Sequence, residues 1–172
     1  MDGRVPRYRR RMESSRSFVP AGFVPPRRLA AQAFVLEPLG PQHNETDYAA
    51  WSSSLEHIRA TPGFARGSWP SESSLAENLA DLEGHARDFA SRRGFTYAVL
   101  DPADRNVIGC VYIYPPDDID ADPEADRDVH DASVRSWVRA DRAELDQPLW
   151  RAVRRWLQAE WPFERVRYAR RH

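Results

Sequence analysis

The spacing of apolar residues changes several times along the chain, and each change predicts a new element. Short apolar runs and period-two alternation are typical of strands, whereas apolar positions three or four residues apart are typical of helices. From residue 33 onward these patterns predict a strand at 34–36, helices over 44–61 and 74–94, strands at 95–100, 107–114 and 132–139, a helix over 149–161 and a strand at 165–168. The resulting order, β-α-α-β-β-β-α-β, predicts an α/β domain of the mixed α+β kind.

Residues that cap helices stand at the expected helix starts. Asn44 is the predicted N-cap of the first helix. Ser74 and Glu77 have the spacing of a capping box at the start of the second helix. Asp146 or Gln147 is expected to cap the third helix.

The two longest predicted strands differ in pattern. Residues 107–114 are apolar on both faces, which is typical of a central strand that is covered on both sides. Residues 132–139 alternate instead, so that Val134 and Val138 share one face and Trp137 lies on the other. The sequence therefore predicts a sheet with layers on both faces.

The first 32 residues differ in composition from the rest of the chain. Eight arginines face only Asp2 and Glu13, and four prolines interrupt any regular spacing. We therefore expect a flexible basic tail over 1–32 and one domain over 33–172. A transit peptide, a start at Met12 and a contact with nucleic acid are the alternatives.

Composition and charge exclude several classes of protein. The chain has 172 residues, 41% of them hydrophobic, which fits one globular domain. The formal net charge of −1 gives the chain no overall attraction to nucleic acid, and no run reaches the roughly 18 apolar residues of a membrane span. Cys110 is the only cysteine, so no internal disulfide or zinc site of paired cysteines can form. This favours a reducing, cytoplasmic compartment.

Three segments in the second half of the chain resemble the core of the GNAT N-acetyltransferases. A polar turn and a glycine-bearing apolar strand over 104–111 are similar to the second hairpin of that family. Ser136 to Arg139 stand where its fourth strand ends, and Leu149 to Trp161 match the helix that faces CoA. The resemblance covers residues 33–168 and implies a GNAT-like mixed, mostly antiparallel sheet flanked by helices.

The resemblance also implies a cosubstrate and a site for it. Acetyl-CoA or another acyl-CoA would donate its acyl group to a small-molecule or peptide amine. A backbone N–H near Val138 would hold the thioester oxygen. The pyrophosphate would lie near Arg139, Arg142 and the start of the third helix, where unpaired N–H groups and the helix dipole favour an anion. Trp137 and Gln147 complete the residues expected at this site, and no catalytic residue is assigned.

The loop before the third helix departs from the family pattern. Leu145 and Gln147 stand where family members have glycines, and Glu144 and Asp146 add negative charge at the expected pyrophosphate position. The chain also stops soon after Tyr168, which implies an exposed edge strand. Two interpretations of this edge stay open: two copies pair there as a homodimer, or charged side chains protect it, namely Arg165, Arg167, Arg170 and Arg171. Two functions stay open: an N-acyltransferase with an altered loop, or a GNAT-like domain that has lost CoA binding and serves as a binding or assembly module.

No metal site is expected. The acidic segment 117–131 lacks the glycine and glutamate positions of an EF-hand, and no pair of histidines has ligand spacing. His85, on a helix beside charged residues, is expected to be solvated.

Two weaker signals concern the acceptor. His130 beside Asp131, at the start of a strand, is a candidate base. Trp69 is expected either to pack against the sheet or, with Phe64 and Arg66, to form an aromatic wall for a small acceptor.

Overall fold

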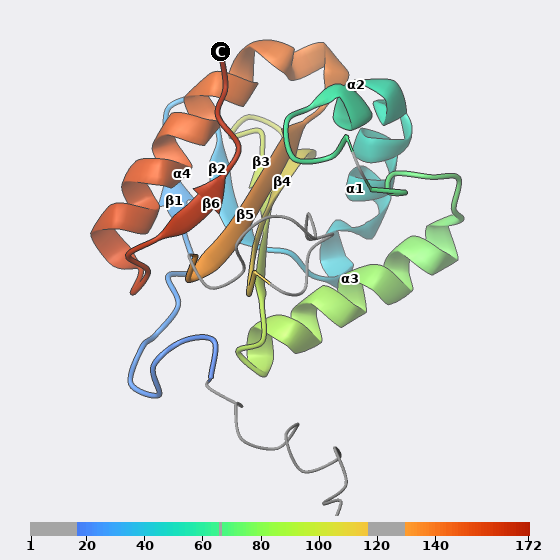
Figure 1. Cartoon of the computed structure of the whole chain (residues 1–172). Coiled ribbons are helices and arrows are strands. Elements are labelled where there is room, and N and C mark those ends of the chain that lie inside the picture. The colour runs from blue at the N-terminus through green and yellow to red at the C-terminus, as the bar shows by residue number, and fades with distance from the viewer. Residues whose placement is uncertain (1–16, 66, 117–129) are drawn as a thin grey trace, which may run out of the picture.

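The computed structural model describes residues 17–65, 67–116 and 130–172, which form one sheet with helices on both faces (Figure 1). The strands are β1 (Leu29–Ala30), β2 (Val35–Pro38), β3 (Phe95–Leu100), β4 (Val107–Tyr114), β5 (Ala132–Val138) and β6 (Val166–Tyr168). The helices are α1 (Asn44–Ser52), α2 (Leu55–Ala60), α3 (Leu75–Ala90) and α4 (Asp146–Glu160), with short 3-10 helices η2 (Pro41–His43) and η3 (Ala140–Leu145). Each predicted strand and helix has a counterpart in the structure.

The strands lie side by side in sequence order, from β1 to β6. Among the described residues, neighbouring strands are antiparallel except for the last pair, β5 and β6, which are parallel. α4 carries the chain from the end of β5 back to the start of β6, as a parallel pair requires. The predicted mixed, mostly antiparallel sheet is therefore confirmed.

The parallel pair is short. It extends from Ala132↔Val166 to Val134↔Tyr168, so β5 continues to Val138 without a partner in β6. β6 is also the last strand of the sheet order and forms one edge. Pairing of two copies at this edge stays a prediction.

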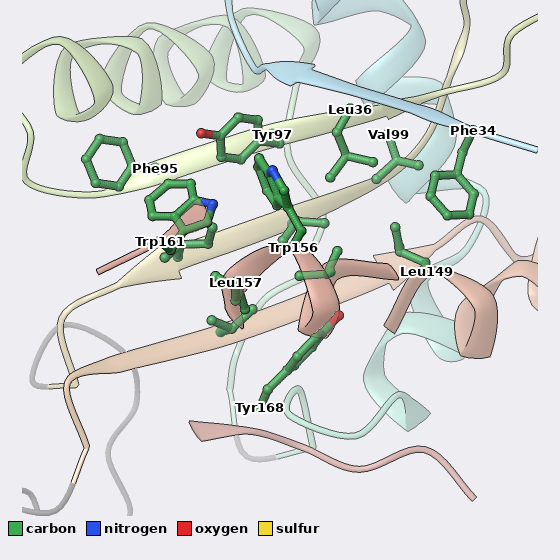
Figure 2. Packing of buried hydrophobic residues seen from close by; sticks show 14 of the residues in the cluster. Phe34, Leu36, Phe95, Tyr97, Val99, Leu149, Trp156, Leu157, Trp161 and Tyr168 are labelled. Carbon is green, nitrogen blue, oxygen red and sulfur yellow. The ribbon is translucent and has the colours of Figure 1, made fainter. Parts of the chain in front are cut away.

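α4 covers one face of the sheet (Figure 2). Its apolar residues recur every three or four positions, so they lie on one side of the helix and are buried: Leu149, Val153, Trp156 and Leu157. The sheet meets them with side chains that include Leu36, Phe95, Tyr97, Val99 and Tyr168. Burial of a large apolar side chain stabilises a fold by about 1.5–3 kcal/mol. This layer therefore fixes the N-terminus of α4 beside β5.

The other face is covered by α1, α2 and α3 (Figure 1). The helices contribute Trp51, Ile58 and Leu82, and the sheet contributes Ala98, Leu100, Cys110 and Trp137. No helix of the described residues is both long and apolar enough to cross a membrane.

β4 is the central strand that its apolar pattern predicted, with both faces buried. Its register against β3 shifts between Val99 and Leu100, which marks a bulge. Just past this irregularity, Gly109 lies directly against the carbonyl oxygen of Trp137, where a Cβ would not fit. The glycine therefore allows β4 and β5 to approach closely at the end of β5.

The predicted helix over 44–61 is in fact two helices, α1 and α2, which break at Ser53–Ser54. The hydroxyl of Ser54 accepts a hydrogen bond from Ala140 N at 2.9 Å, which ties the break to the chain beyond β5. Apolar spacing did not reveal the break, because Trp51 and Ile58 lie on the buried side of both helices.

Of the predicted helix caps, the capping box of α3 is confirmed. Glu77 N donates to Ser74 Oγ at 3.1 Å, and Ser74 N donates to Glu77 Oε2 at 2.7 Å. The other caps were wrong: Asn44 is the first residue of α1, and Asp146 and Gln147 are the first two of α4. The side chains of Asn44 and Asp146 hydrogen-bond to distant residues instead.

Residues 17–32, which composition assigned to the tail, lie against the domain. Val19 is fully buried, the ring of Phe18 stacks on Phe163 with centroids 5.0 Å apart, and β1 pairs with β2. A few apolar residues among the arginines are enough to order this segment, because their burial offsets its conformational entropy. The predictions for residues 1–16, for Arg66 and for the acidic segment 117–129 fall outside the described residues.

Candidate functional site

The end of β5 turns one backbone donor toward the β6 side of the strand. Arg139 N donates to Ile108 O of β4 at 2.8 Å. Because successive residues of an antiparallel strand direct their backbone groups to opposite sides, the N–H of Val138 points away from β4. β6 stops pairing at Tyr168 and does not reach this position.

The side chains of Trp137 and Val138 belong to the core. Trp137 is 0% exposed, and its Nε1 donates to Tyr112 Oη at 3.0 Å. Val138 is 1% exposed and packs on the α4 face. At these two predicted site residues, only the backbone can meet a ligand beside β5.

The two arginines expected at the pyrophosphate have carboxylate partners. Arg139 donates from Nε and Nη2 to the two oxygens of Asp141 at 2.6 and 3.0 Å, and Arg142 Nη2 donates to Asp101 Oδ2 at 2.6 Å. The Arg139 guanidinium lowers the pKa of Asp141. The backbone N–H of Ala103, followed by Arg142, lowers the pKa of Asp101. Both carboxylates are therefore charged at neutral pH and hold the arginines.

η3 takes the place of the glycine-bearing loop before α4. Leu145, at its end, packs against the core, and Gln147 lies partly exposed in the first turn of α4. Asp146, in the same turn, places a carboxylate at the positive end of the helix dipole. Because the Asp146 carboxylate already lies in this turn, the start of α4 does not fit a pyrophosphate in this arrangement.

Arg171 occupies the backbone edge of β5 next to this turn. Its guanidinium donates to Asp146 Oδ2 at 2.7 Å, to Ser136 O at 2.9 Å and to Ala169 O at 2.9 Å. The residue is only 9% exposed. Ser136 O and Val138 N–H lie on the same side of β5, two residues apart, so Arg171 is a neighbour of any group bound at Val138.

A cavity of about 410 Å³ lies on the opposite face of the sheet, between α3, β4 and the loop after α2. This volume is within the range of small-molecule sites, about 300–1,000 Å³. Its wall combines carboxylates with aromatic rings and consists of Leu39, Asp47, Phe64, Gly67, Ser68, Trp69, Asn78, Asp81, Leu82, His85, Asp88, Tyr112, Tyr114 and Arg135.

Two of the cavity's carboxylates lack a cationic partner among the described residues: Asp47 and Asp81. Asp47 is 4% exposed and accepts hydrogen bonds from Asn78 Nδ2 at 3.0 Å and from Cys110 Sγ at 3.4 Å, both neutral donors. Burial raises the pKa of Asp47. Asp81 stands on the cavity side of α3. Both carboxyl groups therefore face the cavity without a cation beside them.

His85 lies partly buried in the cavity wall and is not solvated, contrary to the prediction. Its Nδ1 is 2.9 Å from Tyr114 Oη and 3.0 Å from Thr96 Oγ1, and Tyr114 Oη donates to Asp88 Oδ2 at 3.0 Å. Since the Tyr114 proton goes to Asp88, this network assigns the imidazole proton to Nδ1 and leaves Nε2 as an acceptor. Burial lowers the pKa of His85, so the ring is neutral at pH 7.

Trp69 packs against the sheet and also lines the cavity. Its ring centroid is 5.9 Å from Phe64, 6.3 Å from Tyr112 and 6.0 Å from Trp137. The Arg135 guanidinium lies 5.1 Å from the centroid of Phe64. Trp137 is fully buried and precedes Val138, so Trp69 connects the cavity wall by packing to the end of β5.

His130 beside Asp131 was the candidate for a general base, but the carboxylate of Asp131 has a structural role. Asp131 Oδ2 accepts from Glu164 N at 3.0 Å and Arg165 N at 2.9 Å, which fixes the chain just before β6. His130 does not line the cavity. In the part of the chain that the structure describes, no group of three His, Cys, Asp or Glu residues is arranged to hold a metal ion.

The sequence did contain a signal for the cavity. Asn78, Asp81, His85 and Asp88 are three or four residues apart, so they form a polar stripe beside the apolar stripe of α3. A polar stripe of this kind usually faces solvent, which is why it was missed. Its role depends on Tyr112 and Tyr114 of β4, whose rings contact His85.

Comparison with known proteins identifies the fold. No protein-family model matches the chain, and no curated protein sequence matches it. A ribosomal-protein-S5-alanine acetyltransferase from Vibrio fischeri has a TM-score of 0.58 at 14% identity, over 81% of this chain and 71% of that one. A GCN5-related N-acetyltransferase from Brucella melitensis has a TM-score of 0.55 at 18% identity, over 83% of this chain and 59% of that one.

A third similar structure contains the expected cosubstrate. The microcin C7 self-immunity acetyltransferase MccE, in complex with acetyl-CoA and AMP, has a TM-score of 0.52 at 13% identity, over 74% of this chain and 62% of that one. All three are acetyltransferases, and they share with this chain the arrangement that its second half resembled. The chain therefore has the fold of the GCN5-related N-acetyltransferases, the GNAT family.

Proposed function

We propose that this GNAT-fold chain is an N-acyltransferase that moves an acyl group from acyl-CoA to an amine. One observation carries the proposal. The cavity's aromatic wall reaches Trp137, and the next residue, Val138, turns its backbone N–H to the side that β6 leaves open. The cavity and the backbone donor are thus connected along β5 by the packing of Trp69 on the buried Trp137. The structure of MccE with acetyl-CoA supports acyl-CoA as the donor.

The proposed reaction is direct attack of the amine on the thioester. The amine nitrogen forms a bond to the carbonyl carbon, and the bond from that carbon to sulfur breaks. Val138 N–H donates to the carbonyl oxygen as negative charge develops on it, which lowers the barrier. The amine loses a proton to His85 Nε2, and the departing thiolate takes up a proton, so the products are an amide and a free thiol.

His85 suits the role of proton acceptor. A base must be neutral before the reaction, and the lowered pKa of His85 keeps its ring neutral at pH 7. Tyr114 and Asp88 hold the opposite side of the ring, so that a proton gained at Nε2 is stabilised through the chain of hydrogen bonds to Asp88.

Binding of acyl-CoA at the predicted residues would require rearrangement. Arg139 and Arg142 would exchange their carboxylate partners for phosphates near Gln147, and Arg171 would move from the β5 edge. The Val138 N–H already points to the side of β5 that its role requires, and the movement of Arg171 would uncover it.

A second function is favoured by these same contacts. In the region expected to hold the pyrophosphate, Arg139, Arg142 and Arg171 form ion pairs with carboxylates of the chain itself. A GNAT-fold domain that has lost CoA binding and serves as a binding module would have such a side.

Thermal unfolding with acetyl-CoA separates the two functions. A ligand at about 100 times its Kd stabilises the native state by about 2.7 kcal/mol, which raises Tm by roughly 5–10 °C for a chain of this size. The N-acyltransferase predicts such a rise with millimolar acetyl-CoA and a smaller rise with ADP, which carries a pyrophosphate and no thioester. An unchanged Tm with acetyl-CoA would overturn the enzyme and leave the binding module.

A further inference from the structure

Asp47, which is buried, and Asp81, which is exposed, line the cavity without a cationic partner among the described residues. The third carboxylate, Asp88, pairs with Arg93 Nη2 at 3.3 Å, and the cavity's guanidinium, Arg135, lies over the ring of Phe64. Asp47 is almost fully buried and has only neutral hydrogen-bond donors. A buried carboxylate without a cation is costly, and a positively charged ligand would relieve that cost.

The rest of the wall is apolar and aromatic. Leu39 and Leu82 contribute aliphatic surface, and Phe64, Trp69 and Tyr112 contribute rings. Rings attract a cation to their faces and provide apolar area for the body of a ligand. The cavity therefore has partners for a charged head and for an apolar body.

The cavity offers little to a peptide bond. Asn78 is committed to the fold: its Oδ1 accepts from Trp51 Nε1 at 2.9 Å, and its Nδ2 donates to Asn44 Oδ1 at 2.9 Å and to Asp47. Tyr114 Oη is likewise bonded to Asp88 and His85. A peptide N-terminus would bury amide groups without matching partners, which is unfavourable.

We propose that the cavity binds a small organic ammonium ion, a primary amine with an apolar body. Asp47 and Asp81 hold the ammonium group, and the rings and leucines hold the body. The inference rests on the proposed function only in making this amine the acyl acceptor. Binding itself needs no acyl-CoA.

Calorimetric titration of the whole chain with three ligands of one length tests the proposal. Hexylamine, hexan-1-ol and hexanoate share a body and differ in charge. Hexylamine is expected to bind at least tenfold more tightly than hexan-1-ol, since a hydrogen bond to a charged group exceeds a neutral one by that order. Hexanoate is expected not to bind. Equal affinity for hexylamine and hexan-1-ol, or no binding of hexylamine, would overturn the proposal.

Alaninamide separates a small amine from a peptide N-terminus. It carries an ammonium group beside a peptide-like amide and has almost no apolar body. It is expected to bind more weakly than hexylamine, and tighter binding would overturn the assignment to a small apolar amine.

Variants locate the ammonium group. Asp81→Asn and Asp47→Asn remove one charge each without changing side-chain size, and each is expected to weaken hexylamine binding about tenfold. Glu83→Gln is the matched control, because Glu83 lies exposed on α3 outside the cavity wall. Equal affinities in all three variants would contradict the proposal.

The two proposals fail in different ways. If hexylamine binds and no acyl transfer from acetyl-CoA to it occurs, the proposed function fails and the amine site stands. If acyl transfer occurs on other amines while hexylamine binds no better than hexan-1-ol, the amine site fails and the proposed function stands.

Discussion

The two sides of β5 use charge in opposite ways. On the cavity side, Asp47 and Asp81 have no cationic partner among the described residues, and one of them is buried. On the side of α4, Arg139, Arg142 and Arg171 each meet a carboxylate within 2.7 Å. β5 lies between these two regions and ends at Val138, whose backbone N–H is the proposed donor to the thioester oxygen.

This difference separates charges that serve the fold from charges that serve a ligand. Paired groups satisfy one another, so their removal should damage stability. A buried carboxylate without a cationic partner lowers stability. Its removal should therefore raise stability and weaken the binding of a cationic ligand. The two sides therefore predict stability changes of opposite sign for the loss of one charge.

The largest effect is expected from Arg171→Ala on the paired side. The free energy of unfolding should fall by about 3 kcal/mol, because the change leaves Asp146 and Ser136 O without their buried partner. Urea denaturation measures this change. Arg170→Ala is the control, since Arg170 is exposed, and it should stay within about 0.5 kcal/mol of the wild type.

Equal midpoints for the two arginine variants would show that the paired side does not hold the fold. The double variant Arg171→Met with Asp146→Asn removes both charges together. It should recover most of the loss, because no buried charge is then left alone.

A smaller effect of opposite sign is expected from Asp47→Asn on the cavity side. The free energy of unfolding at pH 7 should rise by about 1 kcal/mol, the scale of an inadequately compensated buried polar group. The pKa of Asp47 is raised above its usual 3.8 by burial, so the wild type loses stability as the pH rises from that value through the folded pKa. The variant lacks this loss.

The stability gap between Asp47→Asn and the wild type should therefore open between acid and neutral pH. Denaturant midpoints at several pH values measure it, with Glu83→Gln as a variant that should show no such gap. A less stable Asp47→Asn would mean that this carboxylate serves the fold.

The smallest effect concerns His85. Burial lowers its pKa in the folded chain below the unfolded value of 6.5. The unfolded chain then binds a proton more readily, so stability is lost as the pH falls through 6.5 toward the folded pKa. Urea midpoints should fall between about pH 7.5 and about pH 5.5. His85→Asn should flatten this fall, while replacement of the exposed His172 by Asn should leave it as it is.

The sequence predicted the elements because their signals are local. Apolar spacing located every strand from β2 to β6, and the spacing of Ser74 and Glu77 located the start of α3. β1 was missed, because Leu29 and Ala30 become a strand only by pairing with β2. The break at Ser53–Ser54 was missed because the apolar positions continue across it.

The site was harder to predict because its properties come from contacts between distant residues. The burial of His85 depends on Tyr112 and Tyr114, more than 25 positions away in the sequence. The resemblance placed Arg139 and Arg142 at a pyrophosphate. Spacing alone could not show that Asp141 and Asp101 already hold them.

The short parallel pair of β5 and β6 also has a consequence for the order in which the sheet opens. Three residue pairs join the two strands, while six join β4 to β5. Pairing of β5 with β6 brings together segments about 34 positions apart, as in the contact of Asp131 with Arg165. Few contacts therefore offset the entropy that is lost when this long loop closes. Short pairings of this kind separate at low free energy in native-state hydrogen exchange. The amides of residues 166–168 should then exchange before those of β3 and β4. Such a partial opening would release Arg171 and uncover Val138 while the rest of the sheet stays folded.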